Sequence, residues 1–218
     1  LVGAHAFPAA LLLLIGALIA SWVDCGTVPF LVVSGLRLIS SKLFLPSVLI
    51  ICSAMSALTG SSWLTCGTLG TAFLGMSASM DIPAGITVGA VLCGAFFGDK
   101  FSRLSDFALS TIAIAGADFS KHTRMMLKTE LPALLVSLTI FFFIGRSYSG
   151  STIDNSSIQN TINILKSSYN INFLTFIPLF MLLLSLLYKL PGVVSVLLST
   201  LSAVIVSLSV QSSSLCHS

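Results

Sequence analysis

The segment from Ala84 to Asp106 reads AGITVGAVLCGAFFGDKFSRLSD, an apolar run followed at once by a charged, serine-containing segment. The run from Ala84 to Gly98 carries no charge, whereas the eight residues after it carry four charges and two serines. Charges inside or beside a bilayer are costly, and they are rare there unless they have a task. The segment therefore predicts an apolar helix that ends at a polar site able to handle an ion.

The composition of the whole chain indicates a membrane protein. Hydrophobic residues make up 56% of the 218 residues and charged residues only 8%, which is more apolar surface than a soluble core of this size encloses. Lipid bilayer is the natural solvent for such runs. The ten basic residues are scattered, which argues against nucleic-acid binding. The five cysteines show no CxxC spacing and are expected to be small buried hydrophobes.

Apolar runs recur along the chain, and none alternates with a period of two, which favours helices. The runs are Phe7–Trp22, Thr27–Ile39, Pro46–Leu58, Trp63–Met80, Ala84–Gly98, Phe107–Ala117, Leu131–Gly145, Ile171–Tyr188 and Val193–Val210. We expect an all-α polytopic protein that passes several times through the cell (inner) membrane.

Basic residues between the runs set the expected orientation. A cluster expected at the cytoplasmic side comprises Lys100, Arg103, Lys121, Arg124 and Lys128. The polar loop 146–170 should then face outside. If Arg37 and Lys42 are also cytoplasmic, an even number of crossings must separate them from Lys121, yet three substantial runs and one short run lie between. A discontinuous or re-entrant segment is therefore expected, as in transporters that bind ions at broken helices.

The two acids of the opening segment are the first candidates for ion handling. A carboxylate in a partly dry site binds a proton or a cation but not both, which is the minimal chemistry of cation/proton exchange. Asp99 and Asp106 are expected to act in this way. The alternative is a solvated helix end, at which Asp99 and Arg103 form a pair worth roughly a few tenths of a kcal/mol.

The second candidate is the hydroxyl-rich segment from Gly60 to Thr71, GSSWLTCGTLGT. Hydroxyls, and carbonyls freed where glycines let the helix unwind, are hard oxygen donors suited to Na+. The alternative is helix packing through small residues repeated every fourth position. That alternative uses Gly67, Thr71, Gly75 and Ser79, with Gly94 and Gly98 in the next run. Both interpretations can hold together.

Two further polar residues fall outside these segments. Asp24 is a lone acid between two apolar runs, and it is either an interfacial charge or a third ion-handling carboxylate. His122 lies in the basic stretch from Asp118 to Lys128 and is expected to be solvated. No hydrolase or nucleotide-binding motif is found, so an enzyme is not expected, nor is a cofactor.

The order of four blocks resembles the NhaC-type Na+/H+ antiporter family, well over roughly residues 10–145 and loosely beyond. The blocks are Gly16–Trp22 with Gly26–Pro29; Thr59–Trp63 with Gly67–Gly70; Gly98–Lys100 with Ser102, Leu104, Ser105 and Asp106; and Ala115–Asp118 leading into His122, Arg124 and Met125. The resemblance implies a secondary transporter with helical hairpins in inverted repeats, which exchanges Na+ for H+. Some relatives of that kind exchange organic acids or amino acids instead.

By motif match, the resemblance implies ion or proton ligands at Asp99, Ser102, Ser105, Asp106, Ser61, Ser62, Thr65 and Thr68, with no resident metal beyond the transported Na+. The sequence departs from the family pattern at several of these blocks. Ser61 and Leu64 replace a threonine and a glycine, and Arg103 replaces a proline. An arginine between two acids could neutralise them or occupy a cation site. In an exchanger of organic acids, Arg103 could bind a substrate carboxylate.

Members of the family are about twice as long as this chain. We therefore expect a fragment, residues 1–218, with one repeat and part of a second, comprising a family-like core at 7–145, the external loop 146–170, and two further transmembrane helices within 171–210. Alternating access would need the missing half or a homo-oligomer. The leading hypothesis is exchange of Na+ or Li+ for H+. The alternatives are an exchanger of organic acids or amino acids, and a degenerate membrane fragment that transports nothing.

Overall fold

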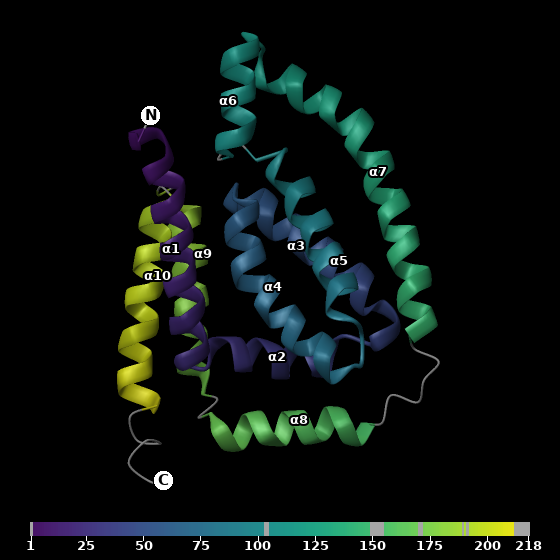
Figure 1. The fold of residues 1–218 in the computed structure, drawn as a ribbon, viewed down its shortest axis with the longest axis vertical. Coiled ribbons are helices and arrows are strands. Elements are labelled where there is room, and N and C mark those ends of the chain that lie inside the picture. Colours follow the sequence, from purple (N-terminus) through teal and green to yellow (C-terminus); the bar gives the residue numbers. More distant parts are fainter. Residues whose placement is uncertain are drawn as a thin grey trace. The chain divides into compact units, whose positions relative to one another are not determined.

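The computed structural model describes residues 2–102, 105–148, 155–169, 172–188, 190 and 192–211, and every regular element in these ranges is helical (Figure 1). The all-α prediction is confirmed. The α-helices are α1 Val2–Asp24, α2 Thr27–Leu38, α3 Phe44–Thr59, α4 Ser62–Ser79, α5 Ala84–Asp99, α6 Asp106–Ala115, α7 Phe119–Tyr148, α8 Asn155–Ser168, α9 Ile177–Leu187 and α10 Gly192–Val206. Short turns are η1 Ser41–Leu43, η2 Phe173–Phe176 and the π-helical η3 Ser207–Gln211.

Membrane-spanning helices are present, and one of them is broken. In the described ranges, Phe119–Tyr148 and Val193–Val210 are long and apolar enough to cross a membrane. The helices Leu13–Asp24 and Thr27–Leu38 qualify together as a third span, bent by 69°. Gly26, with φ of 86°, lies at the break, where a left-handed backbone stops the helix. The prediction of a multi-pass protein with a discontinuous helix is confirmed, but this bend lies before Lys42, not after it.

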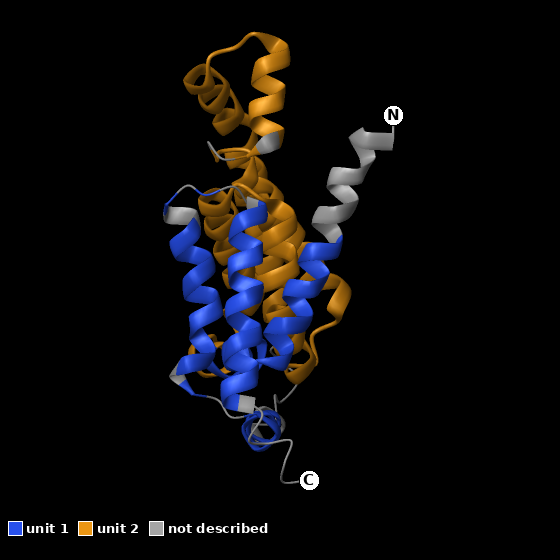
Figure 2. Cartoon of the chain, turned by 90° about the vertical axis from the view of Figure 1, so that its left-hand side faces the viewer, with its two compact units in different colours: residues 1–34, 159–218 blue, residues 35–158 orange. Residues whose placement is uncertain are grey.

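The chain packs as two compact units, which are described separately (Figure 2). Unit 1 comprises residues 1–34 and 159–218, and unit 2 comprises residues 35–158. In unit 1 the buried Trp22 of α1 donates from Nε1 to Ser199 Oγ of α10 at 3.0 Å. Ser199 Oγ in turn donates to the Pro178 carbonyl of α9 at 2.9 Å. One hydroxyl therefore joins three helices.

In unit 2, α3 and α5 pack closely through glycines. A Cβ added at Gly94 would lie 2.9 Å from Cys52 Cβ, and one added at Gly98 would lie 2.9 Å from Ser56 Cβ. The contact advances four residues along both helices, so α3 and α5 run parallel. Ser56 Oγ also donates across the interface to the Ala95 carbonyl at 2.5 Å. The packing prediction for Gly94 and Gly98 is confirmed.

The hydroxyl-rich segment differs from its prediction, because α4 is helical from Ser62 onward and does not unwind. Thr65 and Thr68 donate their hydroxyl protons to carbonyls four residues back, at 3.0 and 2.7 Å, which preserves the helix. The small-residue ridge is also not the packed face, since Gly75 is exposed. The buried face of α4 is formed by Ser62, Leu64, Thr65, Thr68, Gly70, Ala72, Phe73, Met76 and Ser77.

The basic stretch from Asp118 to Lys128, which lies between two predicted apolar runs, forms the cap and the first part of α7. Asp118 precedes this helix, and its Oδ2 accepts from the backbone N–H groups of Ser120 at 3.1 Å and Lys121 at 3.3 Å. This capping satisfies donors that the first helical turn leaves open. The helix then continues for 30 residues into the apolar run. The predicted polar loop likewise contains a helix, α8, although its external location and the domain boundaries stay predictions.

Candidate functional site

Asp99 is the last residue of α5, and its side chain is buried. The residue is only 4% exposed, and Oδ1 has no hydrogen-bond partner among the described residues. A buried carboxylate oxygen without a partner is costly, and most buried polar atoms in proteins are hydrogen-bonded. Asp99 therefore has an open acceptor suited to a proton or a cation.

Ser62 lies at the same level of the α4–α5 hairpin as Asp99. A Cβ added at Gly70 of α4 would lie 3.3 Å from Cγ1 of Val91 in α5. The two helices are antiparallel. Ser62 lies eight residues before Gly70 in α4, and Asp99 lies eight residues after Val91 in α5, so Ser62 and Asp99 lie at one level of the hairpin. Ser62 Oγ is also buried without a partner in the described part of the chain. Two open oxygens are thus placed near one end of the hairpin.

The helix ends around Asp99 add to the electrostatics of the site. Because α3 and α5 are parallel and in contact at Gly98, their C-terminal ends, which carry partial negative charge, lie close together. The N-terminus of α4 carries partial charge of the opposite sign. Ser61 caps that N-terminus, where its side chain accepts from Leu64 N–H at 3.2 Å. The two helix C-termini beside the open Asp99 oxygen suit a bound cation.

The connection from α5 to α6 places two more predicted residues in buried positions. Ser102 is 4% exposed and its backbone N–H donates to the Asp99 carbonyl at 3.2 Å. Ser105 is fully buried and caps α6, accepting from Ala108 N–H at 3.2 Å. The Ser105 hydroxyl, which accepts this one bond, has a further lone pair for a cation. The roles of both serines as ion ligands stay predictions.

A cavity of about 230 Å³ lies beside Asp99, between α5, α6 and α7. Its lining consists of Phe96, Asp99, Lys100, Phe107, Ala108, Thr111, His122 and Met126. The walls are largely apolar, and three ionisable groups face the space. The cavity gives an ion or proton room to approach Asp99 from the α7 side.

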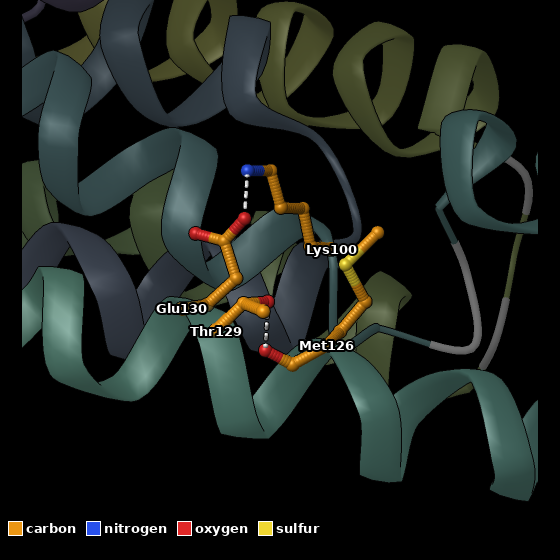
Figure 3. A network of polar contacts seen from close by, with 4 residues as sticks. All are labelled: Lys100, Met126, Thr129 and Glu130. Atoms are coloured by element: carbon orange, nitrogen blue, oxygen red, sulfur yellow. Dashed lines mark hydrogen bonds and ion pairs between the residues drawn. The ribbon is translucent and has the colours of Figure 1, made fainter.

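Lys100, the residue next to Asp99, forms an ion pair with Glu130 of α7. Lys100 Nζ donates to Glu130 Oε1, and Figure 3 shows the two side chains pointing toward one another. The lysine side chain is 42% exposed and the glutamate side chain 22%. Met126 lies one helical turn before Glu130, near the same pair (Figure 3). The pair links the end of α5 to α7.

The predicted site residues fall into three groups. Those with described side chains in unit 2 are Ser61, Ser62, Thr65, Thr68, Asp99, Ser102 and Ser105. Arg103 lies outside the described residues, and Asp106 is described only as the first residue of α6, without its side chain. Asp24 is exposed and belongs to unit 1, in a position that suits an interfacial charge. The ligand roles themselves stay predictions.

Sequence reasoning missed several residues of this region. Glu130 received no role and His122 was expected to be solvated, yet the histidine lines the cavity and the glutamate holds Lys100. The signal was available, because His122, Met126 and Glu130 recur every fourth residue and share one face of a helix. Thr87 and Thr123 also have buried hydroxyls without partners in the described part, and no sequence pattern marks them.

Comparison with known proteins agrees with the arrangement of these motifs. The model of the Na+/H+ antiporter family matches residues 4–125 and 94–218. The chain belongs to this family. The matched ranges include every residue proposed above as an ion ligand.

Antiporters of several kinds are similar to the chain. It is 36% identical to an uncharacterised Na+/H+ antiporter of Haemophilus influenzae, over 97% of this chain and 46% of the relative. It is also 36% identical to the Na+/H+ antiporter NhaC of Alkalihalophilus pseudofirmus, over 94% of this chain and 44% of the relative. A malate-2H+/Na+-lactate antiporter of Bacillus subtilis is 34% identical, over 95% of this chain and 44% of the relative.

The chain spans about half the length of the curated antiporters it matches. No solved structure matches it. Membership of the family and a multi-pass location in the cell membrane are therefore established, while the ions and substrates are matters for proposal.

Proposed function

We propose that the protein containing these residues is a secondary transporter that exchanges Na+ or Li+ for H+ across the cell membrane. The observation that carries this proposal is the open Oδ1 of the buried Asp99, at the end of α5. The names of two similar proteins, both Na+/H+ antiporters, support the same ions.

In this proposal Asp99 holds either the proton or the cation. A cation entering the site would meet the carboxylate, the open Ser62 Oγ and the C-terminal ends of α3 and α5. The carboxylate gives up its proton when the cation binds and takes it back when the cation leaves. Thr65, Thr68, Ser61, Ser102, Ser105 and Asp106 are proposed as further ligands. The opposing surface for alternating access would come from a second half or a second copy.

The test is Na+-driven or Li+-driven proton movement, followed with a pH-sensitive dye in everted vesicles that carry the complete protein. The proposal expects a response to Na+ or Li+, none to K+, and loss of the response in Asp106→Asn at equal membrane expression. A well-inserted protein that shows no proton movement with either Na+ or Li+ would contradict the proposed function.

A second candidate function is the exchange of organic acids or amino acids. The observation that favours it is a relative named for malate and lactate, together with Arg103, a group suited to binding carboxylates. A further relative, 33% identical over 78% of this chain, is an arginine/ornithine antiporter of Halobacterium salinarum. Uptake of a labelled carboxylate that is lost in Arg103→Ala, with no direct Na+/H+ response, would favour this candidate.

A further inference from the structure

Lys100 occupies an unusual position for a lysine beside a buried carboxylate. It follows Asp99 directly, and both residues line the same cavity. An ammonium group this close ordinarily pairs with the carboxylate. Instead, Lys100 Nζ bonds to Glu130 on α7, and Asp99 Oδ1 has no partner in the described part of the chain (Figure 3).

We propose that Glu130 is a positioning residue that holds the Lys100 ammonium away from Asp99 and so leaves the Asp99 carboxylate open to a cation. The role of the cation as a transported ion rests on the proposed function above. The arrangement itself rests on the ion pair, the shared cavity and the open oxygen.

The physical reason is competition between two cations for one carboxylate. Among the described residues that line the cavity, Asp99 has the one carboxylate. If Glu130 is neutralised, the flexible lysine side chain can turn to Asp99 and act as a tethered competitor of Na+. Asp106, the first residue of α6, is the acid that follows in the chain. The pair is partly exposed, so solvent moderates the effect.

The transport test uses the complete protein in everted vesicles. Glu130→Gln is expected to raise the KM for Na+ about three- to tenfold with kcat within about twofold, the size of one partly screened charge. Glu130→Gln combined with Lys100→Met should return the KM to the parental value. Glu130→Asp, which keeps the carboxylate, should have a KM close to the parental value. Thr129→Ala is the neighbouring control, because that hydroxyl donates within its own helix, to the Met126 carbonyl.

Lys100→Met alone separates positioning from simple stabilisation. If the pair serves only to join α5 to α7, removing either partner should do similar harm. The proposal expects asymmetry, with Lys100→Met keeping its KM within about twofold because no competitor remains. An equal rise in the KM for Na+ in Lys100→Met and Glu130→Gln, measured per folded molecule, would overturn the proposal.

A second readout does not depend on transport. Dicyclohexylcarbodiimide adds a protonated carboxylic acid across its C=N bond and rearranges to a stable N-acylurea, which mass spectrometry maps to a residue. A lysine that turns to Asp99 bonds to its open oxygen and blocks the reagent, so labelling of Asp99 should slow about three- to tenfold in Glu130→Gln and recover in the double variant. Unchanged labelling of Asp99, or slowing at Asp106 instead, would overturn the proposal. If labelling of Asp99 slows in Glu130→Gln but the parent protein shows no Na+/H+ exchange, the proposed function is contradicted and this inference is supported.

Discussion

The described parts of unit 1 and unit 2 differ in whether they contain buried polar side-chain atoms without partners. In unit 1, Trp22 Nε1 and Ser199 Oγ are joined by a hydrogen bond, and Thr27 Oγ1 donates to the Thr175 carbonyl at 2.7 Å. Within the described residues, the buried side-chain atoms without partners are Ser62 Oγ, Thr87 Oγ1, Asp99 Oδ1 and Thr123 Oγ1, and all four belong to unit 2.

The difference separates polar groups that build the fold from polar groups that remain available to a ligand. A hydroxyl that joins three helices, as Ser199 does, already uses its donor and one lone pair for structure. An open carboxylate oxygen, as in Asp99, contributes nothing to the fold and costs free energy to bury. In unit 2, Asp99 lies at the end of α5, which packs through glycines against α3, and Ser62 lies at the start of α4.

The largest effect is expected from breaking the glycine contact that builds the site in unit 2. A Cβ at Gly98 would run into the Ser53 carbonyl oxygen, which is backbone and cannot turn away. Gly98→Ala should therefore lower the free energy of unfolding by about 3 kcal/mol. Thermal unfolding in detergent measures this. Gly85→Ala is the control on the same helix, since nothing lies within 4 Å of its Cβ. Equal stability of the two variants would contradict the packing described.

A smaller effect is expected from opening the closed network of unit 1. Ser199→Ala removes the acceptor for Trp22 Nε1 and leaves this buried indole N–H without its partner, while the Pro178 carbonyl loses one of its two donors. Stability should fall by about 2 kcal/mol, while Na+ transport per folded molecule is unchanged. Ser202→Ala removes a hydroxyl that donates within α10, to the Ser199 carbonyl, and should change stability by less than about 0.5 kcal/mol. If Ser199→Ala lost transport without losing stability, the assignment of this unit 1 hydroxyl to the fold alone would be contradicted.

The smallest effect sharpens the comparison inside unit 2. Ser62→Ala removes a hydroxyl that has no partner among the described residues, so stability should not fall. If the hydroxyl contributes to a cation site, the KM for Na+ should rise about threefold, close to the loss of one modest interaction. Thr71→Val, which removes a hydroxyl bonded within its own helix, should leave the KM unchanged. A destabilised Ser62→Ala with an unchanged KM would assign the hydroxyl to the fold.

The sequence was a good guide to the presence of the helices. Apolar runs predicted the helical class, and the spacing of Gly94 and Gly98 predicted a packed face, because both depend on local composition and period. The prediction that α4 unwinds was wrong. The Thr65 and Thr68 hydroxyls donate to carbonyls of an intact helix, so these carbonyls are not free to bind an ion.

The parts that the sequence could not supply depend on tertiary register. Ser62 and Asp99 share a level only because of how the turn between α4 and α5 sets the hairpin, and no residue pattern encodes that alignment. The role of Glu130 was hidden for a different reason. Its face of α7 becomes visible only if the basic stretch is a helix, and the Asp118 cap that starts this helix was not recognised.

The most direct test of the central claim compares two carboxylates, Asp99 in unit 2 and Asp24 in unit 1. Asp99 is buried with an open oxygen, whereas Asp24 is exposed. Na+-driven proton movement should be measured in vesicles of the complete protein for Asp99→Asn and Asp24→Asn at equal membrane expression. We predict that Asp99→Asn abolishes the response and that Asp24→Asn keeps it within about twofold, as expected for an exposed charge. A response that survives Asp99→Asn and disappears in Asp24→Asn would contradict the account.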